Sequence, residues 1–217
     1  MPGYIENALI RFGHEPPDKP QLQPYPHTIP TYGTTVQYAK AADTSPAATK
    51  AEEKYIRQVI GVLLYYGRAV DSTIITGLSS LAAAQANPTT HTLSLVKWLL
   101  DYAATHPDAK IRFNASDMVY WTHSDASYLS ELKAKSRAGG HHFLSTHPAK
   151  LKPGQSPPLN GPIHILCSMI GPVVASAAEA EVAVKKPKVA KAADVAETAK
   201  KPVAKKATPS KGAAKPA

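Results

Sequence analysis

The sequence predicts an α/β fold of the α+β kind, in which a helical half precedes a strand-rich half. Apolar residues recur at helical spacing between residues 49 and 106. After Asp108 they change to short β-rich runs, and from residue 185 onward lysine, alanine and proline dominate. Helices followed by strands are typical of an α+β layer domain. We therefore expect one folded body followed by a tail of different character.

Net charge divides at the same boundary. Residues 1–184 hold 15 Lys and Arg against 14 Asp and Glu, a balance of +1, whereas residues 185–217 hold 10 Lys against two acidic residues, a balance of +8. The single cysteine, Cys167, excludes an internal disulfide and is expected to be a small core residue in a reduced compartment. The sequence shows neither a membrane-span pattern nor a secretory signal, so we expect an intracellular protein with no membrane partner.

The N-terminal elements follow from apolar spacing and proline content. Residues 3–13 place three apolar side chains at helical spacing, and Gly13 is a plausible end for this helix. Seven prolines then interrupt residues 15–48. Because proline cannot continue regular structure, we expect an extended connector along the surface.

Residues 49–106 are expected to form three helices with short connections. Thr49 and Glu52 make a capping box at the start of the first helix. The third helix is expected to end at His106-Pro107. The helices are expected at about residues 50–68, 73–86 and 90–105, with N-caps at Thr49, at Asp71 or Ser72, and at Thr89 or Thr90.

The second half is expected to contain strands and one interrupted helix. The strands are expected at residues 110–113, 118–126, 140–145 and 163–170, with turns at 137–140 and 152–158. Ser176 can open a helix that Pro187 must stop. The order of strands and then a helix indicates the first half of a layer domain.

Two carboxylates are candidates for metal-assisted phosphodiester chemistry. Asp125 is expected at a strand end beside small residues, where a carboxylate can bind Mg²⁺, although an ordinary turn aspartate is the simpler alternative. Glu179 has a structural role, because it completes a capping box with Ser176. Glu181 lies about 200° further round the helix and is the residue that could meet Asp125. Two-metal hydrolysis needs more carboxylates than this pair supplies.

Histidines and loop cations are less specific. Zinc is disfavoured, because there is one cysteine and no histidine pair at i,i+4 spacing on a helix. His141 and His142 are expected to point to opposite faces of a strand. Lys133, Lys135 and Arg137 are open to two interpretations, contact with a nucleic-acid backbone or a solvated loop.

Several segments in order resemble one family of proteins. The segments are residues 1–14, residues 55–66, the helix before Asn87-Pro88, residues 93–102, His123-Ser-Asp125-Ala-Ser, residues 135–144, and Ser176-Ala-Ala-Glu-Ala-Glu181. They resemble copia-type LTR-retrotransposon polyproteins. The first segment is similar to the thumb at the end of the reverse transcriptase, the next three to the region after the polymerase, and the last three to the ribonuclease H motifs.

The resemblance implies a site and a fold. It implies that Asp125 and Glu181 are the inherited catalytic and metal-binding residues, with Mg²⁺ as cofactor only if the site is active, and no small-molecule cofactor. The family's third aspartate, in a Thr-Asp-Asn-type motif, has no counterpart here, and neither have the polymerase fingers and palm. The implied fold is a helical connection region followed by an incomplete ribonuclease H-like mixed sheet. The expected domains are a thumb-like helix remnant (1–14), a Pro-rich connector (15–48), a helical connection region (49–106), a truncated ribonuclease H-like domain (107–184) and a disordered Lys/Ala/Pro tail (185–217).

The tail resembles the C-terminal tail of a linker histone. It has too little bulky apolar area to offset chain entropy, so we expect disorder. Its lysines can neutralise phosphates without reading bases, which favours a nuclear over a cytoplasmic location; the alternative is a solubilising linker without a partner. The expected nucleic-acid-binding residues are Lys185, Lys186, Lys188, Lys191, Lys200, Lys201, Lys205, Lys206, Lys211 and Lys215.

The functional expectation is non-specific binding of DNA or an RNA–DNA hybrid, with little or no hydrolysis. An enzyme alternative is metal-dependent cleavage of RNA in RNA–DNA hybrids as part of a reverse-transcriptase polyprotein, with the missing carboxylates supplied by another chain. A third alternative is a gene relic or fused gene model without function. A sheet face left uncovered by missing helices is expected to support association with partners.

Overall fold

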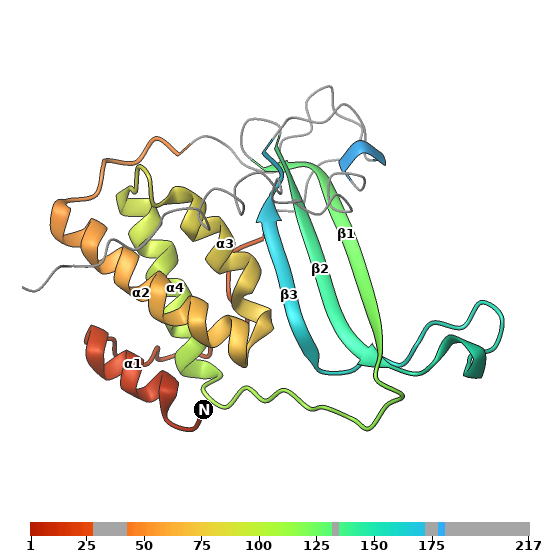
Figure 1. Ribbon diagram of the computed structural model, residues 1–217. Coiled ribbons are helices and arrows are strands. Elements are labelled where there is room, and N and C mark those ends of the chain that lie inside the picture. The colour runs from red at the N-terminus through yellow and green to blue at the C-terminus, as the bar shows by residue number, and fades with distance from the viewer. Residues whose placement is uncertain (28–42, 132–134, 172–177, 181–217) are drawn as a thin grey trace, which may run out of the picture. The chain divides into compact units, whose positions relative to one another are not determined.

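Helices α1 to α4 and a three-stranded antiparallel sheet form the described part of the protein (Figure 1). The computed structural model describes residues 1–27, 43–131, 135–171 and 178–180. The chain divides into two units, Met1–Lys185 and Lys186–Ala217, and every described residue belongs to the first. The predicted α+β class is confirmed. The predicted disordered tail at 185–217 lies outside the described residues.

Local capping defines the ends of the first two helices. Helix α1 (Tyr4–Phe12) ends at Gly13, which adopts a left-handed conformation with φ 57° that glycine accepts at little cost. Helix α2 (Lys50–Ala69) begins at the predicted capping box. The backbone N–H of Thr49 donates to Oε2 of Glu52 at 2.7 Å, and the side chain of Thr49 accepts from the backbone N–H of Glu52.

The next two helices also begin at predicted caps. The side chain of Asp71 accepts from the N–H of Thr73 and opens a 3₁₀ turn, Ser72–Ile74, which continues as α3 (Ile75–Ala84). Thr89 caps α4 (Thr90–Thr105), which ends at His106 as predicted. The apolar faces of all four helices meet in one core. Its fully buried members include Ile5, Ile56, Val59, Leu63, Leu78, Leu81, Val96, Leu99 and Leu100.

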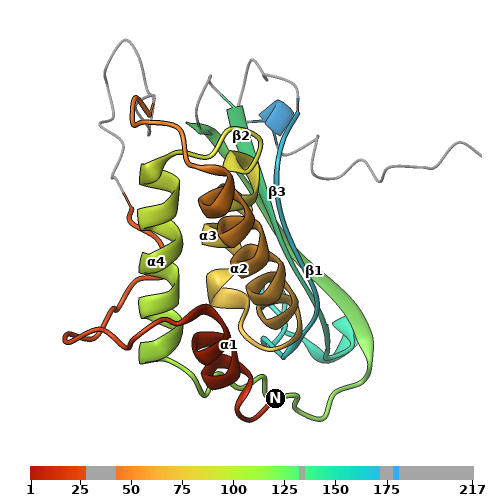
Figure 2. The same ribbon diagram turned by 90° about the vertical axis from the view of Figure 1, so that its left-hand side faces the viewer.

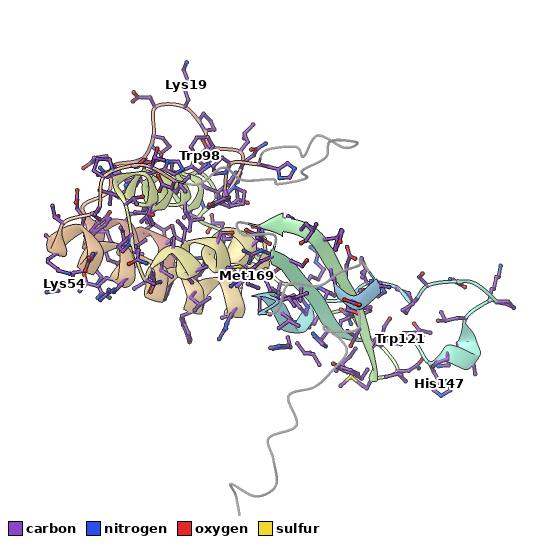
Figure 3. The ribbon with its side chains drawn as sticks, turned by 90° about the horizontal axis from the view of Figure 1, so that it is seen from above. Lys19, Lys54, Trp98, Trp121, His147 and Met169 are labelled. Carbon is purple, nitrogen blue, oxygen red and sulfur yellow. The ribbon has the colours of Figure 1, made fainter. Side chains whose placement is uncertain are left out.

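The connector after α1 lies along helix α4. Its residues up to His27 form no helix or strand, as predicted for the part of 15–48 that the structure describes. Its backbone instead bonds to side chains: the N–H of Gln21 donates to Oγ1 of Thr105 at 3.0 Å, and Nε1 of Trp98 donates to the carbonyl of Gln23 at 2.8 Å. Figure 3 shows Trp98 beside this connector.

The sheet is an antiparallel meander in the order β1, β2, β3 (Figures 1 and 2). The strands are β1 (Val119–Glu131), β2 (Lys135–Ser145) and β3 (Pro162–Met169). The expected mixed sheet is therefore wrong for the described residues. Both pairs of neighbouring strands, β1 with β2 and β2 with β3, are antiparallel.

The strand expected at residues 110–113 is also wrong, because this segment is irregular. The backbone just beyond it is satisfied by one side chain: the N–H of Asn114 donates to Oδ1 of Asn160 at 2.7 Å, and Nδ2 of Asn160 donates back to the carbonyl of Asn114 at 2.9 Å. Gly161 permits this close approach, since a Cβ there would lie 2.7 Å from the carbonyl oxygen of Arg112. These hydrogen bonds from the Asn160 side chain replace the backbone bonds that a neighbouring strand would supply to Asn114.

The turn expected at residues 137–140 is wrong as well, because these residues lie inside β2. Gly139 pairs with Asp125 and Gly140 with Ser124. The pairing is disrupted further along, between Ser127 and Glu131, where Leu129 has a positive φ of 51°. Neither glycine marks a chain reversal, and Gly140 marks close packing, since a Cβ there would lie 3.1 Å from Nε2 of His142.

Candidate functional site

Asp125 lies within β1 rather than at its end. Its side chain is exposed, and its backbone partner across the sheet is Gly139. The backbone N–H of Ala126 donates to Oδ1 of Asp125 at 2.8 Å. The prediction of a strand-end position is therefore wrong, because β1 continues to Glu131.

Asp125 and the helical residues 178–180 belong to opposite faces of the sheet. Ala180 is fully buried against Ala138 and Ile170, and Ala126 packs against the same cluster. Since neighbouring strand residues point to opposite faces, Asp125 points away from the face on which Ala180 packs. Glu181 lies outside the described residues, so its meeting with Asp125 stays a prediction.

The described residues do not fit a magnesium ion. In residues 1–27, 43–131, 135–171 and 178–180, no group of three or more His, Cys, Asp or Glu side chains is placed to hold a metal. Asp125 supplies one exposed carboxylate, of which one oxygen already accepts a backbone hydrogen bond. Magnesium requires a near-octahedral set of oxygen ligands, so no catalytic step through Mg²⁺ follows from this arrangement.

Arg137 is buried, which contradicts both sequence interpretations of it. Its Nε donates to Oε1 of Glu131 at 2.8 Å, and its two terminal nitrogens donate to the hydroxyls of Ser79 and Ser80 on α3, at 2.5 and 3.1 Å. Burial lowers the pKa of the guanidinium, but the hydrogen bond and charge of Glu131 outweigh this effect and raise the pKa above its usual value. Arg137 therefore joins β2 to α3 and is not available to a nucleic acid.

Cys167 is only partly buried, so its assignment to the core is wrong. Its Sγ lies 3.8 Å from Oγ1 of Thr76 on α3 and 3.7 Å from a terminal nitrogen of Arg137. Both contacts are polar. Cys167 is therefore one of the polar side chains through which β3 contacts α3.

The other face of the sheet carries two histidines side by side. His142 pairs with His164 across β2 and β3, with ring centroids 5.1 Å apart and an interplanar angle of 54°. Nδ1 of His142 lies 3.1 Å from the hydroxyl oxygen of Thr122 and also contacts the hydroxyl of Tyr120. Burial, followed by the neighbouring His164 and His141, lowers the pKa of His142.

His141 occupies the opposite face, as predicted for adjacent strand residues. Its ring packs on Phe143 with centroids 5.1 Å apart, and its Nε2 lies 3.2 Å from the carbonyl oxygen of Asn160. His123, the partner of His141 on β1, also packs on Phe143, with ring centroids 5.1 Å apart. The pairing of His142 with His164 was missed by sequence reasoning, because only strand register brings these distant residues together.

Comparisons with protein-family models, with curated proteins and with solved structures find no match for this chain. Among the helices that the structure describes, none combines the length and apolar character needed to cross a bilayer. The ten tail lysines lie outside the described residues. The class that the structure defines is an α+β protein with a helical core and an antiparallel three-stranded sheet.

Proposed function

We propose that this protein is a retrotransposon-derived, truncated ribonuclease H-like protein that binds nucleic acid non-specifically through its basic tail, without catalysis. The observation on which the proposal rests is the balance of +8 in residues 185–217, against +1 in residues 1–184. The order of strands followed by helical residues agrees with the resemblance and supports the ribonuclease H-like part.

The tail composition favours binding to phosphates over reading of bases. Lysine is a flexible point charge that neutralises phosphate groups and releases condensed counterions. The tail contains no Arg, Asn or Gln, the side chains that most often recognise purines in the major groove by paired hydrogen bonds. We therefore propose DNA and RNA–DNA hybrids as partners, bound with steep salt dependence and little sequence preference.

Removal of residues 185–217 is expected to abolish salt-sensitive nucleic-acid binding. For the full chain, the logarithm of the association constant should fall with the logarithm of salt concentration with a slope of up to about −9, if all ten lysines neutralise phosphates. The truncated chain, with a balance of +1, should show a slope near zero. Fluorescence anisotropy with labelled duplexes of two unrelated sequences measures both quantities. Unchanged affinity after truncation would exclude the tail as the binding element.

A matched pair of variants separates charge from tail length. Replacement of five lysines by glutamine should reduce the slope by about half, while the same five changes to arginine should preserve it, because arginine keeps the charge. The five positions are Lys200, Lys201, Lys205, Lys206 and Lys211. Equal loss of affinity in both variants would contradict a purely electrostatic interaction.

Asp125→Asn is expected to leave any cleavage of an RNA–DNA hybrid at background level, as in the unchanged protein. The reason is that Asp125 is one exposed carboxylate on the face opposite Ala180, whereas metal-assisted hydrolysis needs several converging ligands. The amide oxygen of asparagine can still accept from Ala126, so the fold should persist. The measurement is hybrid cleavage with and without Mg²⁺; activity that Asp125→Asn removes would establish the enzyme alternative instead.

A further inference from the structure

We infer that His142 and His164 form a binding site for a late first-row divalent cation such as Zn²⁺, on the sheet face that carries Tyr120. The two histidines are directly opposite each other on neighbouring strands. Imidazole is a preferred ligand of zinc, nickel and copper, whereas magnesium prefers oxygen. This site is separate from the carboxylates discussed above and does not depend on the proposed nucleic-acid function.

The distance between the rings fits a shared ion. Zinc binds imidazole nitrogen at about 2.0–2.1 Å, so two imidazoles on one tetrahedral ion have ring centroids roughly 5 Å apart. The observed separation of His142 and His164 is 5.1 Å. The rings are inclined to each other by 54°, so they are not stacked face to face.

Two hydroxyls orient His142 in the way that metal ligands are usually oriented. Tyr120 and Thr122 both contact Nδ1, which leaves Nε2 for the ion. Nε2 packs over Gly140, where a Cβ would approach it to 3.1 Å, so the absence of a side chain at Gly140 permits this position of the ring. His164 is exposed and has no hydrogen-bond partner in the part of the chain that the structure describes.

Two protein ligands leave coordination positions open. A tetrahedral ion bound by His142 and His164 would take water or an external ligand at its remaining two positions. Open positions distinguish this site from a closed structural zinc site and permit an anionic group, such as a phosphate or carboxylate, to bind the ion directly.

The test is a titration of the full chain, without a polyhistidine tag, with ZnCl₂. The imidazole resonances of His142 and His164 should shift together in the NMR spectrum, and calorimetry should give one ion per chain. His164→Ala, at an exposed position, should lower the affinity at least about tenfold, since even loss of a residue that only orients a ligand costs about 10–100-fold. MgCl₂ should cause no shift.

Two further variants define the outcome. Tyr120→Phe, at a side chain that is 58% exposed, should weaken zinc binding about tenfold without unfolding the sheet, because it removes one hydroxyl from Nδ1. His123→Ala, on the opposite face, should bind zinc as the unchanged protein does. The inference is overturned if ZnCl₂ moves neither resonance, if His164→Ala retains full affinity, or if His123→Ala loses it.

Discussion

Replacement of Arg137 by methionine is expected to lower the free energy of unfolding by about 3–5 kcal/mol, the usual cost of breaking a buried ion pair. Arg137 is 8% exposed, and its side chain bonds to Glu131, Ser79 and Ser80. Methionine has a similar length but no charge. The largely buried carboxylate of Glu131 would therefore lose its ion pair with the guanidinium. The change is measured by urea unfolding.

Two control variants identify the source of the loss. Arg137→Met combined with Glu131→Leu should recover much of the stability, since removing both charges leaves neither unpaired. Arg137→Lys should be intermediate, because lysine keeps the charge but lacks the planar group that reaches both serines. If Arg137→Met lowers the free energy of unfolding by less than about 1 kcal/mol, the pair of Arg137 and Glu131 contributes no more than a surface ion pair does.

Leu99→Ala is expected to destabilise the protein by about 2–5 kcal/mol, because it opens a cavity in the helical core. Leu99 lies on α4, is fully buried and belongs to the cluster that includes Leu63 of α2 and Leu78 of α3. Domains of ordinary stability have about 5–15 kcal/mol in total, so this single change removes a large fraction. Urea unfolding, followed by fluorescence and circular dichroism, measures the loss.

The control for Leu99→Ala is Ile10→Ala, in which a helical side chain that is 78% exposed loses a comparable number of carbon atoms. Its effect should stay within about 0.5 kcal/mol. Trp98 on α4 and Trp121 on β1 report on the helices and the sheet, respectively (Figure 3). With Trp121→Phe, the remaining fluorescence follows the helices alone. Comparable losses for Leu99 and Ile10 would contradict the buried position of Leu99 in the helical core.

The helices were the most predictable part of the structure. Thr49, Asp71 and Thr89 act as N-caps, and Gly13 ends α1, as predicted. A cap requires only residues within one helical turn, so its chemistry can be read from a short stretch of sequence. The helix expected at residues 73–86 begins as a 3₁₀ turn and continues as α3. It is shorter than expected, since α3 ends at Ala84.

The strands were predicted less well. Three of the four expected runs overlap strands, but residues 110–113 do not pair, because Asn160 satisfies the backbone beside them. The turn expected at Gly139-Gly140 lies within a strand. Glycine marks a turn or a close approach with equal ease, and only the packed neighbours distinguish the two.

For the candidate site, sequence identified residue types and the structure decided which of them meet. The sequence identified Asp125 as a candidate carboxylate from its neighbours. It did not predict the sheet face to which Asp125 points, because one step of register moves every side chain to the other side of a sheet. The binding and cleavage measurements above test the proposed functions of the tail and of Asp125.

The sequence by itself determined the α+β class, the helix caps and the concentration of positive charge in residues 185–217, since each depends on composition or on residues close along the chain. Only the tertiary structure decided that Arg137 is buried against α3, that Asp125 faces away from Ala180, and that His142 meets His164. Those facts depend on pairing between distant strands and on packing of a helix against them, which no local pattern specifies.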